Sequence, residues 1–338
     1  MGNEGKPPVQ LVAADNQTVS HLGNDAFGGV DFVPVIISEV GSDATRSFLS
    51  FFVDHIRNKN TRDAYLRAVN RFFDWAELRG LTLDRIQSFH VSGYIEELGK
   101  TMAIPTVKQN LAALRMLFDW LMIRQVCRTN PCHAVRGPKL KITSGKTIAL
   151  DEADAKRLLT SIPTNNLVGL RDRALIALMT YTFARVSAAL SMDVEDYEPR
   201  GRRMWIRLLE KGSRVHAMPA HHKLEEYLDS YIRAADLASQ PKSPLFRSAI
   251  GRTGKLTTKR LLRANAWDAV RRRARNAGVQ GRIGNHSFRA TGVTNYLTNG
   301  GKLETAQQMA GHADARTTKL YDRRNDQISL DEIERITI

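Results

Sequence analysis

The sequence predicts a mainly α-helical protein with a small β-sheet, divided into two domains. Apolar residues recur every three or four positions through most of residues 42–310, the period of helices with one buried face. Two short apolar runs instead flank a Lys-Gly-Ser turn at residues 211–213, a pattern typical of a β-hairpin. The length of 338 residues exceeds what one compact core usually accommodates, which favours two domains.

Four helices are expected in the first domain, residues 43–135. Ser42 can cap the first helix, and the second follows Asn60 and stops at Gly80. The third lies around residues 91–98, and the fourth starts near Pro105, a residue suited to a first helical turn. Residues 1–42 show no sustained period, despite an apolar patch at residues 33–37, and are expected to form a poorly ordered leader or a segment that docks on another surface.

Residues 136–147 contain Gly, Pro, Ser and four cations and are expected to form an exposed linker. In the second domain, residues 148–338, helices are predicted at residues 151–162, 167–181, 222–238, 258–277, 286–298 and 303–310, and the hairpin strands at 204–209 and 214–219. The C-terminal tail, about residues 326–338, is expected to form a short amphipathic helix with Leu330, Ile333 and Ile336 on its apolar face.

The net charge of +15 points to a nucleic-acid partner. Residues 1–42 hold one Lys against five acids, a net of −4, so the rest of the chain carries +19. Charge held on the folded body favours a basic groove that neutralises phosphates. No apolar run approaches the ~18–20 residues that a membrane span needs. The two cysteines, Cys127 and Cys132, suit reduced thiols in the cytoplasm and are too few for a disulfide scaffold or a zinc site.

The candidate catalytic residues are cations, proton donors and one phenol: Arg185, Lys211, His286, Arg289, His312 and Tyr321. A spacing of three puts His286 and Arg289 on one helix face. Cleavage of a phosphodiester needs a nucleophile, cations on the non-bridging oxygens, and groups that move protons at the attacking and leaving oxygens. These six side chains can supply that set.

The order Arg…Lys…His-x-x-Arg…Gly-His…Tyr resembles that of the tyrosine recombinase (phage integrase) family of site-specific DNA recombinases. The resemblance extends from about residue 43 to the end and is most specific in 286–321, where His312 precedes Tyr321 by nine residues. It implies a helical core-binding (SAM-like) domain followed by a tyrosine recombinase catalytic domain. Together they would form a C-shaped clamp on DNA.

The resemblance also implies a role for each candidate. Tyr321 would be the nucleophile that forms a 3′-phosphotyrosyl link, with Arg185 and Arg289 on the phosphate oxygens. Lys211 would protonate the leaving 5′-oxygen, His286 would support proton transfer at the tyrosine, and His312 would donate a hydrogen bond to the phosphate. No metal or other cofactor is expected, because the covalent link conserves the phosphodiester energy.

One position departs from the family pattern. Many members carry an acidic residue three positions after the first arginine, where this chain has Ala188. Such an acid usually orients neighbouring basic groups. Asp193 and Glu195 are the candidate substitutes.

The partners implied are double-stranded DNA with paired inverted recombinase-binding sites and three further copies of the chain, in a homotetramer that acts through a Holliday junction. Accessory DNA-bending proteins are further candidates, and a cytoplasmic, nucleoid-associated enzyme of a mobile genetic element is expected. The expected DNA contacts are Lys108, Arg115, Arg271 and Arg272. Two alternatives stay open: a type IB topoisomerase that relaxes DNA, and a DNA-binding regulator that kept the fold without catalysis.

Overall fold

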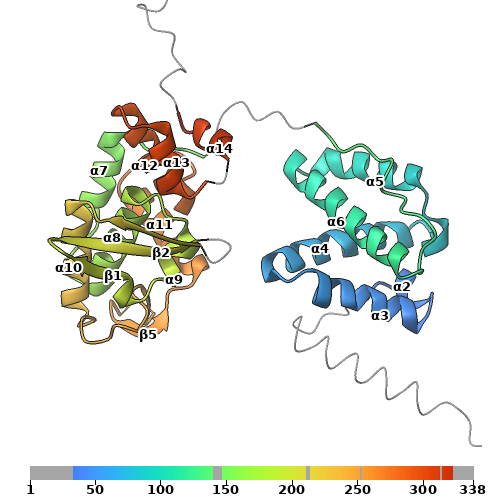
Figure 1. Ribbon diagram of the computed structural model, residues 1–338, viewed down its shortest axis with the longest axis horizontal. Coiled ribbons are helices and arrows are strands. Elements are labelled where there is room, and N and C mark those ends of the chain that lie inside the picture. Colours follow the sequence, from blue (N-terminus) through green and yellow to red (C-terminus); the bar gives the residue numbers. More distant parts are fainter. Residues whose placement is uncertain (1–32, 140–146, 211–213, 252, 313, 323–338) are drawn as a thin grey trace, which may run out of the picture. The chain divides into compact units, whose positions relative to one another are not determined.

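The computed structural model describes residues 33–139, 147–210, 214–251, 253–312 and 314–322. The chain divides into two compact units, Met1–Lys141 and Ile142–Ile338 (Figure 1). The division falls inside the segment 136–147 that was expected to be a linker. Each unit has its own hydrophobic core.

The first unit is helical. Its elements are α2 (Val35–Ser38), α3 (Ser42–Ser50), the π-helical turn η1 (Phe51–His55), α4 (Lys59–Glu77), the 3₁₀ turn η2 (Leu83–Arg85), α5 (Ser88–Thr101) and α6 (Ile104–Ile123). Helix α4 begins where the Asn58 side chain accepts a hydrogen bond from the Thr61 backbone at 3.2 Å, and α6 begins with Pro105 in its first turn. The four expected helices are thus confirmed, but the N-cap of α3 is Gly41 and not Ser42, and α4 begins at Lys59, before Asn60.

Aromatic side chains form the centre of the first core. Phe72 and Phe118 are fully buried, and their rings meet edge to face at 6.2 Å where α4 packs on α6. Truncating such a ring to alanine would cost about 3–5 kcal/mol. Ile36 and Ile37 on α2 are buried in the same core. The prediction that the leader extends to residue 42 is therefore wrong for α2, because two adjacent isoleucines provide apolar surface that the core covers.

The second unit is mainly helical with two small antiparallel sheets. Its helices are α7 (Glu152–Ser161), α8 (Leu167–Tyr181), α9 (Val186–Ser191), the turn η3 (Val194–Asp196), α10 (His222–Ala234), α11 (Arg263–Asn276), α12 (Asn285–Thr298), α13 (Leu303–Ala310) and α14 (Ala315–Lys319). The strands are β1 (Tyr197–Arg200), β2 (Arg203–Glu210), β3 (Arg214–Pro219), β4 (Arg247–Ala249) and β5 (Leu256–Arg260). One sheet has the order β1-β2-β3 and the other pairs β4 with β5 (Figure 1).

Helix α8 is the centre of the second unit, packed between α10 and α12. Gly292 lets α12 pack tightly on α8, since a Cβ at this position would lie 1.9 Å from the Thr180 carbonyl oxygen. Asp172 on α8 is fully buried and pairs with Arg171 at 2.6 Å and with Arg273 of α11 at 2.9 Å. These contacts hold α11 and α12 against the helix that leads to Arg185.

The two expected hairpin strands are confirmed as the antiparallel pair β2 and β3, in which Leu208 faces His216 and Glu210 faces Arg214. The predicted Lys-Gly-Ser turn between them lies outside the described residues. The prediction of one helix over 258–277 is wrong at its start. Residues 256–260 form β5, paired with a strand of only three residues, and α11 begins at Arg263. The two threonines at 257 and 258 favour a strand.

Candidate active site

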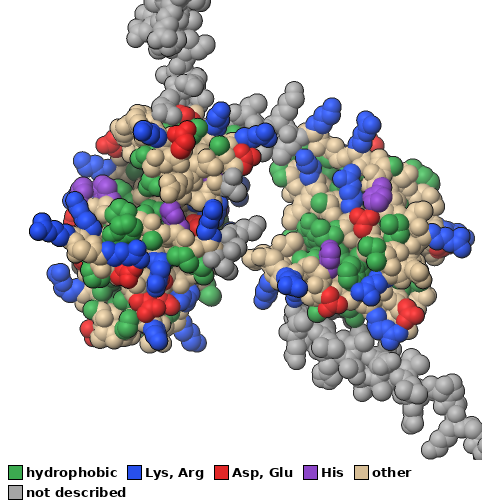
Figure 2. Space-filling model, in the orientation of Figure 1, with side chains coloured by type: hydrophobic (Ala, Val, Ile, Leu, Met, Phe, Trp, Pro, Cys, Tyr) green, Lys and Arg blue, Asp and Glu red, His purple; other side chains and the backbone are tan. Residues whose placement is uncertain are grey.

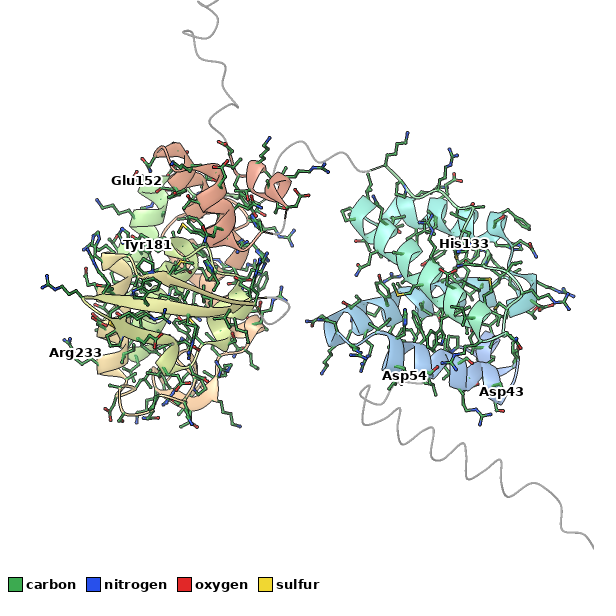
Figure 3. The ribbon with its side chains drawn as sticks, viewed as in Figure 1. Asp43, Asp54, His133, Glu152, Tyr181 and Arg233 are labelled. Atoms are coloured by element: carbon green, nitrogen blue, oxygen red, sulfur yellow. The ribbon has the colours of Figure 1, made fainter. Side chains whose placement is uncertain are left out.

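Arg185 stands at the junction between α8 and α9. Helix α8 ends at Tyr181, labelled in Figure 3, and Phe183 then adopts a left-handed conformation with φ of 56°, uncommon for a bulky residue. Arg185 follows as the N-cap residue of α9, and its guanidinium forms an ion pair with Glu210 at the end of β2. The sharp turn thus brings this cation from the core helix to the end of the central strand β2.

Arg289 is buried on α12, only 2% exposed. Its guanidinium donates to the Phe183 carbonyl oxygen, and through Nη2 to the Ala310 carbonyl oxygen at 2.5 Å. Burial, and then the nearby charge of Arg185, lower the pKa of Arg289 to about 10. Two backbone carbonyls from separate elements therefore fix this arginine beside Arg185.

His286 lies on α12 and His312 in the turn after α13, and both are near the two arginines. His286 lies one turn before Arg289 on α12. Desolvation, followed by the charges of Arg289, Arg263 and Arg185, lowers its pKa, although its side chain keeps contact with solvent. Both arginines are thus close enough to favour the neutral form of this imidazole.

His312 follows Gly311, which ends α13 in the left-handed conformation with φ of 56°. The His312 Nδ1 lies 2.9 Å from the hydroxyl of Thr318. Burial, and then the charges of Arg289 and Arg185, lower the pKa of His312 to about 4. If Nδ1 accepts from Thr318, Nε2 carries the proton and can donate to a ligand.

Tyr321 lies just after α14 and is half-buried. Its ring stacks on the His312 ring with centroids 6.0 Å apart and planes 7° from parallel. Its side chain lies near enough to Arg289 to oppose the lowering of that arginine's pKa, and its carbonyl oxygen accepts from the Thr294 hydroxyl at 3.2 Å. The phenol is therefore held among the cations of its own subunit.

The structure brings together five of the six candidate catalytic residues: Arg185, His286, Arg289, His312 and Tyr321. Lys211 lies outside the described residues. Its neighbours Glu210 and Arg214 face each other across the hairpin. The five side chains provide two guanidinium groups, two neutral imidazoles and a phenol, a set suited to binding and attacking a phosphodiester.

Glu210 is a residue of this site that the sequence reasoning missed. It is 7% exposed and pairs with Arg185. The two acids suggested as substitutes at position 188 form ion pairs with other arginines: Asp193 pairs with Arg260 at 2.6 Å, and Glu195 lies 3.8 Å from Arg207. The available signal was strand alternation, which puts Glu210 on the same buried face as Leu208.

The expected DNA contacts are not part of this cluster. Lys108 is exposed on α6, and Arg115 donates to the carbonyl oxygens of Cys132, at 3.2 Å, and Val135. Arg271 stacks 4.4 Å over the Trp267 ring, and Arg272 reaches the Asp172 carboxylate at 3.3 Å. Arg115 and Arg272 therefore make intramolecular contacts. Figure 2 shows Lys and Arg side chains on both units, on the face in view.

Among the described residues, no group of three or more His, Cys, Asp or Glu side chains is placed to hold a metal ion. In the same part of the chain, no helix is both long and apolar enough to span a membrane.

Two family models match the chain. The phage integrase family model matches residues 149–327, more than half of the chain, and the N-terminal SAM-like domain of phage integrases matches residues 47–125. The chain belongs to the phage integrase family. It is a site-specific tyrosine recombinase. The SAM-like domain model matches within the helical first unit, and the phage integrase model matches within the second unit.

Known recombinases of similar length resemble it. The tyrosine recombinase XerC of Thermodesulfovibrio yellowstonii is 26% identical over 289 residues, covering 82% of this chain and 91% of XerC. A lambda integrase (75-356) dimer bound to a COC′ core site has a TM-score of 0.65 at 16% identity, covering 84% of this recombinase and 97% of the integrase. XerH bound to palindromic difH substrate in a post-cleavage complex has a TM-score of 0.61 at 18% identity, covering 87% and 94%. These two structures share the fold.

Proposed function

We propose that this recombinase cuts and rejoins DNA through a 3′-phosphotyrosyl intermediate on Tyr321. The observation that carries the proposal is the environment of the phenol. It stacks on His312 and lies near enough to Arg289 to act on the pKa of that arginine, while Arg185 lies close enough to lower the pKa of both His312 and Arg289. A phosphodiester placed among these groups meets a nucleophile and two cations at once.

In the proposed step, the phenolic oxygen of Tyr321 forms a bond to the scissile phosphorus as the bond to the 5′-oxygen breaks. The phenolic proton passes to a base, and the 5′-oxygen takes a proton and leaves as a hydroxyl. Arg185 and Arg289 neutralise the charge that builds on the non-bridging oxygens. One phosphoester bond replaces another, so the reaction reverses when a 5′-hydroxyl attacks the phosphotyrosine.

The two histidines suit different parts of this step. His286 has a lowered pKa and is neutral at pH 7, so it can accept the proton that leaves Tyr321. His312 is held by Thr318 at Nδ1 and can donate from Nε2 to a phosphate oxygen. Lys211 is proposed, from the family resemblance, as the acid for the leaving 5′-oxygen.

Two units that each carry exposed cations support a clamp on double-stranded DNA, with Lys108 and Arg271 as proposed contacts. Solved proteins of the same fold, lambda integrase on a COC′ core site and XerH on difH, were captured on DNA and support this partner. Paired inverted sites, a homotetramer and a Holliday junction complete the proposal, in the service of a mobile genetic element. The similarity to XerC favours strand exchange over DNA relaxation.

The test is Tyr321→Phe on a nicked duplex that traps the cleaved strand. We expect normal DNA binding and no SDS-resistant protein–DNA adduct, since only the nucleophilic oxygen is lost. Tyr296→Phe is the matched control, because Tyr296 packs against the same apolar cluster of Phe183 and Val293. An adduct formed by Tyr321→Phe, or lost in Tyr296→Phe, would show that the nucleophile is misassigned.

The tetramer is tested separately through the tail, which lies outside the described residues. A helix this short is stable only when its apolar stripe is buried, and we propose that a neighbouring subunit buries it. Deleting residues 326–338 should then spare cleavage of a single site and abolish synapsis and strand exchange. Loss of cleavage together with exchange would mean that the tail docks on its own subunit.

A further inference from the structure

The cation-rich site contains a buried carboxylate. Glu210 is 7% exposed, and its side chain forms an ion pair with Arg185, whose side chain is 31% exposed. A carboxylate is costly to bury unless a charge or hydrogen bonds compensate it. The ion pair with Arg185 provides that compensation for Glu210.

The β-hairpin explains why Glu210 points inward. Side chains alternate between the faces of a strand, so Ile206, Leu208 and Glu210 share one face of β2, and all three are buried. The outward residue Leu209 is 53% exposed. Glu210 thus continues a row that anchors the hairpin to the core.

A second element closes over the ion pair. A Cβ built on Gly311 would lie 3.7 Å from the Glu210 Cγ and 3.9 Å from the Arg185 Nη1. Gly311 immediately precedes His312, so the turn after α13 lies close to both partners of the ion pair. The ion pair therefore lies where β2, the start of α9 and the turn after α13 meet.

The Glu210 carboxylate offsets part of the positive charge around it. Arg185 lowers the pKa of Arg289, His286 and His312, whereas Glu210 acts on Arg289 in the opposite direction. Ala188, on α9, is buried and offers no charge. With Asp193 and Glu195 paired elsewhere, the acid beside Arg185 comes from the strand and not from α9.

We propose that Glu210 is a positioning residue that fixes the Arg185 guanidinium for the scissile phosphate. The inference rests on the proposed cleavage reaction. The guanidinium has five N–H donors, and an ion pair on one edge leaves others for phosphate oxygens.

The experiment is a double-mutant cycle in single-turnover cleavage, with Glu210→Gln, Arg185→Ala and the two combined. Glu210→Gln keeps the size of the side chain and removes its charge. We expect roughly 10- to 100-fold slower cleavage, the loss typical of a reacting group displaced by about 1 Å. If Glu210 acts through Arg185, adding Glu210→Gln to Arg185→Ala should change the rate by less than about threefold.

Glu304→Gln is the matched control, because Glu304 is an exposed acid on α13 that lines the same cavity as Glu210. It should cleave within about threefold of the wild-type rate. Circular dichroism checks folding. If Glu210→Gln does not fold, Glu210→Asp, which keeps the charge and withdraws the carboxylate by one methylene, replaces it in the cycle and should show a smaller loss with the same non-additivity.

A wild-type rate for the Glu210 variant, or losses that multiply with Arg185→Ala, would overturn the role of Glu210. Either result leaves the proposed function intact as long as wild-type protein forms a Tyr321-dependent adduct. Absence of that adduct from wild-type protein would contradict the proposed function itself.

Discussion

Replacing Asp172 by asparagine should destabilise the second unit strongly. The Asp172 side chain is 1% exposed and accepts from the Arg171 Nε at 3.1 Å and Nη2 at 2.6 Å, and from the Arg273 Nε at 2.9 Å. The side chains of Arg171 and Arg273 are 3% and 10% exposed, so neither can turn to bulk water when the carboxylate charge is removed.

Breaking a buried ion pair from one side costs about 3–5 kcal/mol, because the remaining charge stays buried without compensation. For a unit of this size, about 1 kcal/mol corresponds to about 2–4 °C in Tm, so Asp172→Asn should lower the Tm of the second unit by roughly 6–20 °C. Differential scanning calorimetry and urea unfolding measure the change.

Asp154→Asn is the control. Asp154 pairs with Arg157 one turn away on α7, where the arginine side chain is 52% exposed. Exposed pairs of this kind contribute at most about 1 kcal/mol. Equal losses in the two variants, or a loss below about 1 kcal/mol for Asp172→Asn, would refute the assignment of Asp172 as the charge centre that joins α8 to α11.

Three further predictions concern the candidate active site, the packing of α12 and DNA binding. His312 has a folded-state pKa of about 4 against 6.5 unfolded, so the unfolded chain binds more protons in that window. Stability should fall by up to about 3 kcal/mol as pH drops from 6.5 to 4, and His312→Asn should remove that part of the decline in urea titrations. Gly292→Ala should lower stability by about 1–3 kcal/mol and slow cleavage by displacing α12, whereas Gly99→Ala, with open space around it, should be neutral or stabilising; the reverse order would contradict the packing. DNA affinity should fall with salt at a log–log slope near −9 for about ten neutralised phosphates, and a slope near zero would contradict the clamp.

The helices were predictable where local signals agreed. In α4 and α6 the apolar period, the cap region and the Pro105 start all indicate helix, and both occur close to the expected bounds. Strand β5 was missed because it pairs with the short β4, a contact between separate segments that no local period reveals. Helix α2 was missed because four residues are too few to show a period.

The candidate catalytic set came from residue order and family resemblance, and the structure brings its five described members into one cluster. Glu210 could not be identified in the same way, because its ion pair with Arg185 joins residues 25 positions apart and depends on the register of β2. The contacts of Arg115 and Arg272 could not be predicted from the sequence either. A basic residue on a helix looks the same in sequence whether it meets DNA, backbone carbonyls or a buried carboxylate such as Asp172.

The covalent adduct itself offers the most direct measurement. Wild-type protein would be trapped on a nicked duplex carrying its native flanking DNA, digested, and the nucleotide-bearing peptide sequenced by mass spectrometry. We expect Tyr321 to carry the nucleotide through its 3′-phosphate, with a free 5′-hydroxyl on the other side of the cut. A nucleotide on any other residue, or a link through a 5′-phosphate, would contradict the proposed reaction.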